Sequence, residues 1–321
     1  MDGNDTGESG NSTMPSLFVF TGDSLAPLFF TLLMVVMIFI LLGNALTIIA
    51  VLKWKVLQTV TNMFIISLSL SDLLLAVSLP HYCINNFTAI ITNYESQRIS
   101  CLVNLNIMCI SIASSTYNIL AIAVDRYIQI FHGLRYNVLM TRSKALSIIV
   151  TLWVFSSFVF TFVVWNFNLY HFKHCSILSV LQPSVKSVVT FVCMPSIIIT
   201  VILHAFNFRA AWVQSRQISQ QTTSMNNNET INRKKILKIT TMMSLVVGVF
   251  LTAWIPFTIM GNIYTSMDHP RRWHDVTYQL VLIVLMANSG INPLIYAWKN
   301  RSFRSAFMHL LFIKRVNDII D

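Results

Sequence analysis

Residues 26–52 read APLFFTLLMVVMIFILLGNALTIIAVL and contain no charged side chain. About 20 residues of α-helix cross the hydrocarbon core of a membrane, because each residue advances the helix by about 1.5 Å. Backbone N–H and C=O groups inside lipid need partners within their own segment, which favours a helix over an isolated strand. We therefore predict that this stretch forms a membrane-spanning helix.

Six further stretches have the same length and character. Four contain no Lys, Arg, Asp or Glu, and they cover residues 101–124, 145–170, 188–208 and 239–267. Residues 276–298 are also uncharged, and residues 62–81 contain a single acid, Asp72. Charged residues make up 11% of the chain, whereas a soluble domain carries roughly 25%. None of the seven runs has the polar stripe of a soluble helix, so we predict an all-α membrane protein, a seven-transmembrane-helix bundle.

Basic residues are divided unequally between the connections. With the N-terminus outside the cell, the inward-facing segments are residues 53–61, 125–144, 209–238 and 299–321, and they hold 17 of the 22 Lys and Arg residues. Cytoplasmic loops of membrane proteins carry such an excess. We therefore predict a multi-pass plasma-membrane protein with an extracellular N-terminus. Its net charge of +10 favours contact with anionic inner-leaflet lipid and gives no reason to expect nucleic acid as a partner.

The predicted spans divide the chain into three parts: an extracellular tail (1–25), a transmembrane domain (26–298) and a cytoplasmic amphipathic helix with a tail (299–321). Basic and aromatic residues alternate in the last part, as in a helix that lies on a membrane surface. Residues 214–232 are rich in Gln, Ser, Thr and Asn, which predicts a flexible loop. Glycosylation triplets in the outward segments begin at Asn4, Asn11 and Asn86.

A few polar and helix-breaking residues interrupt the apolar runs. Asp72 lies in the middle of a span, where a charged side chain costs a few kcal/mol unless it faces the bundle interior and has partners. The adjacent Asp125 and Arg126 lie at the inner end of a span and form a candidate charge pair. Pro256 and Pro293 each remove a backbone donor and are expected to kink their helices.

These residues belong to an ordered set that resembles the rhodopsin-like (class A) G-protein-coupled receptors from about residue 43 to residue 307. In chain order the set is Gly43-Asn44, Leu70-Ser71-Asp72-Leu73, Cys101, Asp125-Arg126-Tyr127, Trp153, Pro195, Phe250, Trp254-Ile255-Pro256 and Asn292-Pro293-Leu294-Ile295-Tyr296. Each element is weak alone, but their order and spacing together are specific. The second inner loop, residues 134–141, is similar to that of adenosine and melanocortin receptors.

The resemblance implies a sodium site and a signalling switch. It brings Asp72 together with four oxygen-bearing side chains, Ser115, Asn288, Ser289 and Asn292, which are the ligand type that a hard cation prefers. A sodium ion is thus expected as an allosteric modulator, with no resident cofactor and no other metal. The resemblance also implies a heterotrimeric G protein as partner and the following switch residues: Asp125, Arg126, Tyr127, Pro256, Pro293 and Tyr296. It pairs Cys101 with Cys175 in a disulfide.

Family positions also define a ligand pocket, with seven expected lining residues: Met108, Cys109, Ile112, Trp254, Phe257, Thr258 and Met286. Met108 stands where amine receptors place an acid, and Met286 stands where opsins place the retinal-binding Lys. Gly261 occupies the position of the purine-binding Asn of adenosine receptors. Met and aromatic walls favour a neutral or apolar extracellular small molecule.

Other classes of function remain as alternatives. An amine, purine or peptide receptor has the same fold, and so does a decoy that does not couple, because Leu203 and Gly133 depart from the family pattern. A transporter needs polar residues along several helices, and only Asp72 qualifies. An enzyme needs clustered reactive side chains at one membrane face, and the sequence shows none, so we predict a receptor and not an enzyme.

Overall fold

The computed structural model describes residues 23–87, 94–168, 183–220, 227–267 and 271–311. Within these ranges seven long helices form the bundle: α1 (Ala26–Lys53), α2 (Val60–Phe87), α3 (Tyr94–Phe131), α5 (Arg142–Asn168), α7 (Pro183–Gln220), α8 (Asn227–Thr265) and α9 (Arg272–Lys299). Shorter helical segments connect or follow them: η1 (Lys55–Leu57), η2 (Gly133–Arg135), α4 (Tyr136–Leu139) and α10 (Arg301–Leu310). All seven long helices are long and apolar enough to cross a membrane, which confirms the predicted fold class.

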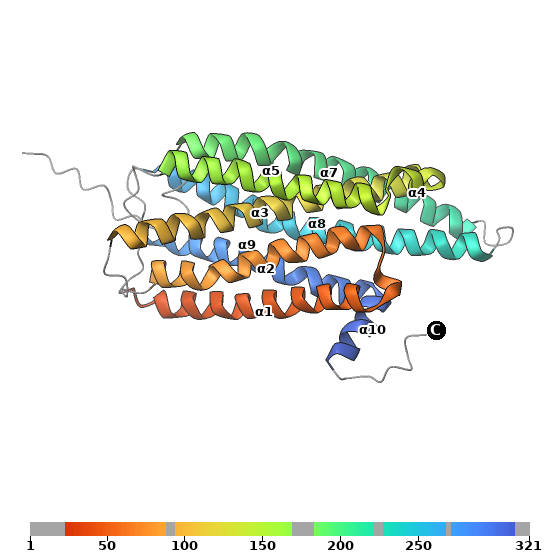
Figure 1. Ribbon diagram of the computed structural model, residues 1–321, viewed down its shortest axis with the longest axis horizontal. Coiled ribbons are helices and arrows are strands. Elements are labelled where there is room, and N and C mark those ends of the chain that lie inside the picture. The colour runs from red at the N-terminus through yellow and green to blue at the C-terminus, as the bar shows by residue number, and fades with distance from the viewer. Residues whose placement is uncertain (1–22, 88–93, 169–182, 221–226, 268–270, 312–321) are drawn as a thin grey trace, which may run out of the picture.

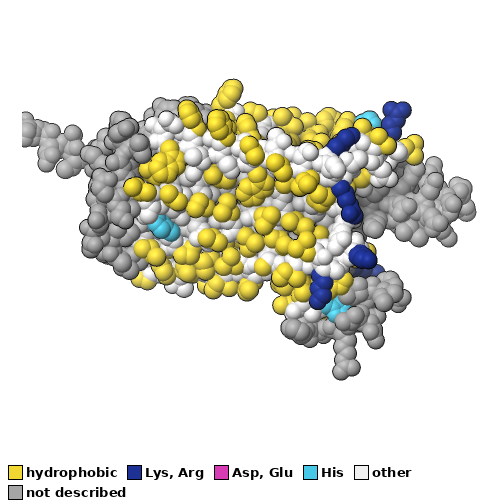
Figure 2. All heavy atoms as spheres, in the orientation of Figure 1, with side chains coloured by type: hydrophobic (Ala, Val, Ile, Leu, Met, Phe, Trp, Pro, Cys, Tyr) yellow, Lys and Arg dark blue, Asp and Glu magenta, His cyan; other side chains and the backbone are white. Residues whose placement is uncertain are grey.

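The seven helices run side by side along one axis, and α10 turns away from them (Figure 1). We refer to the end that carries α4 and α10 as the α10 end. Neighbouring pairs in contact include α1 with α2, α2 with α3, α8 with α9, and α1 with α9. The outer surface is largely apolar along the length of the bundle (Figure 2), and large side chains such as Phe158 and Phe191 are 73% and 82% exposed there. Lipid is the environment in which such a surface is stable.

The interior differs from a soluble core because it combines apolar and polar side chains. Asn44, Asp72 and Asn118 are 0 to 1% exposed. The amide of Asn44 joins α1 to α9 by donating hydrogen bonds to the carbonyl oxygens of Ile40 at 3.0 Å and Ser289 at 3.1 Å. Buried polar groups are stable when they have such partners. These bonds fix the relative placement of the helices around Asp72.

Gly43 allows α1 to lie directly against the kink of α9. A Cβ atom built on Gly43 would be 3.0 Å from Cγ of Pro293. This separation is shorter than ordinary van der Waals contact, so a larger residue would force the helices apart. The family element Gly43-Asn44 thus has a packing role as well as a hydrogen-bonding one.

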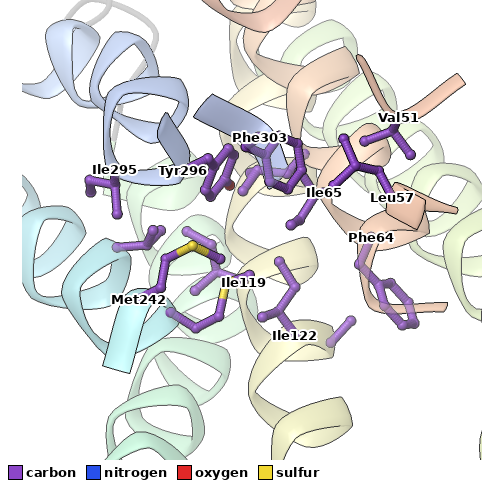
Figure 3. Close-up of a cluster of buried hydrophobic side chains, with 14 of the residues drawn as sticks. Val51, Leu57, Phe64, Ile65, Ile119, Ile122, Met242, Ile295, Tyr296 and Phe303 are labelled. Carbon is purple, nitrogen blue, oxygen red and sulfur yellow. The ribbon is translucent and has the colours of Figure 1, made fainter. Parts of the chain in front are cut away.

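Near the α10 end, a cluster of buried apolar side chains joins seven helices, namely α1, α2, α3, α5, α8, α9 and α10 (Figure 3). Phe303 of α10 is fully buried and lies 5.6 Å from the ring of Tyr296 in α9, and Phe307 is 8% exposed. The apolar face of the predicted amphipathic helix therefore packs partly on the bundle itself. This contact fixes α10 beside the end of α9.

The predicted flexible loop at residues 214–232 is largely helical. α7 continues to Gln220 and α8 begins at Asn227, while residues 221–226 lie outside the described part of the chain. Extending an existing helix adds one hydrogen bond for each residue that is fixed, without the cost of a new nucleus. Composition alone therefore placed the helix ends too close to the membrane.

Candidate functional site

Asp72 lies in the middle of the bundle with partners from α3 and α9. The hydroxyl of Ser115 donates to Asp72 Oδ1 at 3.2 Å, and the amide of Asn292 donates to Oδ2 at 3.0 Å. Ser289 lies within hydrogen-bonding reach of the same carboxylate. Three of the four predicted partners therefore contact Asp72 directly, and all of these donors are neutral.

The fourth predicted partner, Asn288, lines a small cavity next to this group. The cavity has a volume of about 20 Å³, and Ser115 and Ser289 also contribute to its walls. The other six lining residues are apolar or aromatic. A cavity above about 10–15 Å³ can hold one water-sized occupant where polar groups reach it. Asn288 Oδ1 is buried without a partner among the described residues. The site thus offers a negative charge, several oxygen atoms and space for a single small ion.

Three of the predicted ligand residues, Ile112, Trp254 and Met286, also line this cavity. Met108 and Met286 are each 1% exposed and belong to one buried cluster, against which Ile112, Trp254 and Phe257 pack. The rings of Trp254 and Phe257 are perpendicular with centroids 6.1 Å apart. The structure therefore brings five of the seven predicted pocket residues together.

The other two predicted pocket residues do not join this cluster. Cys109 packs against a separate cluster that contains Tyr117, Phe160 and Cys193, between α3, α5 and α7. It points there because one residue along an α-helix turns the side chain by about 100°. Thr258 donates its hydroxyl to the carbonyl oxygen of Ile255 within α8. Cys109 and Thr258 therefore stay predictions as pocket residues, and these contacts lie outside this cluster.

Aromatic residues of α8 link the pocket to the α10 end. Trp254 packs against two buried clusters: the upper cluster, which contains Met108 and Met286, and the lower cluster near the α10 end, which contains Tyr296 and Phe303. Its ring centroid lies 5.6 Å from that of Phe250, which is buried in the lower cluster. Pro256 lies inside α8 two residues after Trp254. A displacement of Trp254 would therefore be transmitted to side chains at both levels of the bundle.

At the α10 end, Asp125 and Arg126 form a buried ion pair with 2.5 Å between Asp125 Oδ2 and Arg126 Nη2. Thr61 Oγ1 donates to Asp125 Oδ2 at 2.8 Å, and the hydroxyl of Tyr136 donates to Oδ1 at 2.7 Å. Arg126 Nη2 also contacts Thr61. Burial, together with the negative charge of Asp125, raises the pKa of Tyr136, so this hydroxyl stays protonated.

The remaining predicted switch residues are not members of this ion pair. Pro293 lies inside α9, and Tyr296 is fully buried with its hydroxyl unpaired among the described residues. Tyr127 stacks near Phe131 at 4.6 Å between ring centroids. Tyr296 thus packs with Phe303 in the cluster near the α10 end.

The predicted disulfide and glycan sites lie near the opposite end or outside the described residues. Cys101 is disulfide-bonded, and Cys175, which the resemblance pairs with it, falls in the part of the chain that is not described. The same holds for Asn4 and Asn11. Asn86 is 1% exposed and donates to the carbonyl oxygen of Tyr82 at 2.8 Å. A glycan needs solvent access, so this burial argues against modification of Asn86.

The sequence reasoning missed two partners of Asp125. Thr61 belongs to α2, and Tyr136 begins α4 in the segment that resembles adenosine and melanocortin receptors. The resemblance of residues 134–141 to those receptors does not by itself predict a contact between Tyr136 and Asp125. A buried carboxylate at the end of a span requires hydrogen-bond donors. Which residues supply them depends on how the helices pack, and the sequence does not show this.

Comparison with known proteins places this geometry in a family. The model of the 7 transmembrane receptor (rhodopsin family) matches residues 43–296. Melanocortin receptor 4 of Danio rerio is 29% identical over 282 residues, which cover 84% of this chain and 79% of that protein. Melanocortin receptor 3 of Homo sapiens is 29% identical over 282 residues, covering 84% and 81%. Melanocortin receptor 5 of Homo sapiens is 28% identical over 297 residues, covering 84% and 80%.

Proposed function

Because this chain belongs to the rhodopsin family of seven-transmembrane receptors, we propose a ligand class, a cation and a switch for it. The family consists of receptors and not enzymes, and the chain is a cell-surface G-protein-coupled receptor in the plasma membrane. Its finer properties follow from the buried groups of the bundle. The excess of Lys and Arg in the connections at the α10 end supports a cytoplasmic α10 end and an extracellular N-terminus.

The ligand proposed for the outer half of the bundle is a neutral or apolar small molecule. The observation that carries this proposal is the joint burial of Met108 and Met286 against Trp254 and Phe257. Apolar surface removed from water contributes about 25 cal/mol per Å². A cationic amine would lose its hydration there without gaining an ion pair, since helix α3 contains no acid between residues 101 and 124.

Sodium is the proposed modulator of the same receptor. The carboxylate of Asp72 has only neutral donors among the described residues, and three oxygen-bearing side chains, Ser115, Asn288 and Ser289, line part of a cavity of about 20 Å³. A hard cation bound there would neutralise the buried charge. It would also hold α3 and α9 together beneath Trp254, which opposes movement of α8.

The proposed switch is the release of Arg126 at the α10 end. A ligand that displaces Trp254 would bias α8 about the kink at Pro256, because α8 packs on both clusters. Outward movement of one helix is a two-state change that a ligand can bias only through unequal affinity for the two states. In the active state, the side chain of Arg126 leaves Asp125 and contacts the G protein.

The relatives favour a second ligand class, a melanocortin. Three of them are named as melanocortin receptors and match over 84% of this chain. Leu203 and Gly133 keep a third possibility open, a receptor that binds ligand without coupling. Cells that express the receptor with several G-protein sensors separate these candidates when they are challenged with melanocortins, neutral lipids and monoamines.

Monoamines test the pocket assignment most sharply. We expect no activation of the native receptor at micromolar concentration, and we expect Met108→Asp to create a response to at least one monoamine. Met108→Asn is the control, because Asn has nearly the same size as Asp and carries no charge. This variant should gain no response to monoamines. Activation of the native receptor by a monoamine at nanomolar concentration would contradict the proposed ligand class.

A further inference from the structure

The α10 end contains a second cavity that the ligand and sodium sites do not use. It has a volume of about 700 Å³, which is within the usual range of small-molecule sites. It lies where η1, the start of α2, α4 and the junction of α9 with α10 meet. Figure 2 shows Lys and Arg side chains gathered at this end of the bundle.

The walls of this cavity carry four positively charged residues: Arg126, Arg142, Lys299 and Arg301. None of the described residues that line it is acidic. Arg142 is held at the wall because its Nη2 donates to the carbonyl oxygen of Gln58 at 3.1 Å. Like charges repel one another, so these four basic side chains are most stable when an anion lies between them.

Two helix N-termini add to this positive field. Val60 and Thr61 open α2, and Arg301 and Ser302 open α10, and all four line the cavity. A side chain caps one donor in each first turn, since Thr59 Oγ1 accepts from the N–H of Asn62 and Asn300 Oδ1 accepts from the N–H of Ser302. The other first-turn N–H groups have no partner within their helix, and the helix dipole is positive there. Phosphate groups bind at such positions.

Arg126 provides an independent sign that the cavity accepts a ligand. Its side chain is 1% exposed, lines the cavity, and carries a nitrogen, Nη1, without a hydrogen-bond partner among the described residues. A buried charged donor left without a partner is costly. A ligand oxygen in the cavity would supply that partner while Nη2 remains paired with Asp125.

We propose that this cavity binds an inositol polyphosphate group, held by the guanidinium groups of Arg126, Arg142 and Arg301 and by the first turns of α2 and α10. Phosphate monoesters match guanidinium groups in charge and geometry. The same chemistry occurs in the headgroup of an inner-leaflet phosphoinositide and in free inositol phosphates. An occupied cavity would block the surface on which Arg126 meets the G protein.

Binding is measured on purified full-length receptor in nanodiscs, without agonist or G protein. One arm titrates inositol 1,4,5-trisphosphate into phosphatidylcholine nanodiscs by calorimetry. The other arm counts phosphatidylinositol 4,5-bisphosphate molecules retained by the receptor in native mass spectra. The cavity variant is Arg142→Gln with Arg301→Gln. The control is Arg135→Gln with Arg304→Gln, which removes two exposed arginines from the same end outside the cavity.

We expect the cavity variant to bind at least about tenfold more weakly, because each lost charged hydrogen bond costs about that factor. The control should stay within about twofold, since neither Arg135 nor Arg304 lines the cavity and salt screens charges that do not contact the ligand. Binding in the first arm identifies a free inositol phosphate as a ligand, and binding in the second arm alone identifies the lipid headgroup. Equal loss in both variants, or no binding of wild-type receptor in either arm, would overturn the proposal. A receptor that fails to signal leaves this measurement unaffected.

Discussion

Two buried acids, Asp72 in the middle of the bundle and Asp125 at the α10 end, have different partners for their negative charge. Asp125 is paired with Arg126 at 2.5 Å and accepts hydrogen bonds from Thr61 and Tyr136. Asp72 accepts bonds from Ser115 and Asn292, and among the described residues no cationic side chain forms an ion pair with it. Both carboxylates are at most 1% exposed.

Asp125 thus has a counter-ion within the protein, whereas Asp72 has none among the described residues. A buried ion is stable when it is both paired and hydrogen-bonded. Asp125 meets both conditions within the protein, whereas Asp72 meets only the second. We therefore propose a mobile cation as the missing partner of Asp72, and the departure of Arg126 as the change that breaks the pair with Asp125.

The largest effect is expected from breaking the pair of Asp125 with Arg126. Asp125→Asn keeps the size of the side chain but leaves the buried guanidinium of Arg126 without its counter-ion, which costs about 3 kcal/mol or more. Purified receptor should unfold at a lower temperature, and ligand-free G-protein activation in cells should rise. Unchanged unfolding temperature and unchanged basal activation together would show that the pair does not hold the silent state.

A smaller effect is expected from removing one donor to the same acid. Tyr136→Phe deletes the hydrogen bond to Asp125 Oδ1 and leaves the ion pair in place, at a cost of about 1.5 kcal/mol. Because the raised pKa of Tyr136 keeps its hydroxyl protonated, this difference between the two proteins should be constant from pH 6 to pH 8. Thermal unfolding at three pH values measures it, and a difference that disappears by pH 8 would contradict the assignment.

The smallest effect is expected at an exposed acid. Asp23 pairs with Arg272 at 2.9 Å, but Arg272 is 64% exposed, so solvent screens the pair. The backbone N–H of Leu25 and then Arg272 lower the pKa of Asp23. This contribution is present above the ordinary pKa of an Asp and is lost as pH falls through the lowered value. Asp23→Asn should therefore leave the unfolding temperature at neutral pH unchanged, and a clear decrease would show that burial does not separate these acids.

The sequence predicts the fold well because the requirement to cross lipid acts on each span separately. Residues 26–52 differ by one residue from α1 (Ala26–Lys53). The limits of α7 and α8 were predicted poorly, since those helices continue beyond the membrane, where hydropathy carries no signal.

The site could be predicted only where family order supplies the contacts. Three of the four partners of Asp72 follow from that order, and the structure places them beside its carboxylate. Tyr136 was not predicted as a partner of Asp125, because the path of the second inner loop depends on packing. Cys109 packs on a different cluster from Met108 because neighbouring residues of one helix point about 100° apart.

The central claim, that Asp72 needs a mobile cation and Asp125 does not, is tested by the sodium dependence of thermal unfolding. Wild-type receptor, Asp72→Asn and Tyr136→Phe are each unfolded in sodium chloride and in potassium chloride at equal ionic strength. A bound ion stabilises the folded state by about RT ln(1 + [Na⁺]/Kd), so sodium should raise the unfolding temperature of wild type and Tyr136→Phe. Asp72→Asn should show no difference between the salts. A wild-type receptor that unfolds at the same temperature in both salts, or an Asp72→Asn variant that still responds to sodium, would contradict the account.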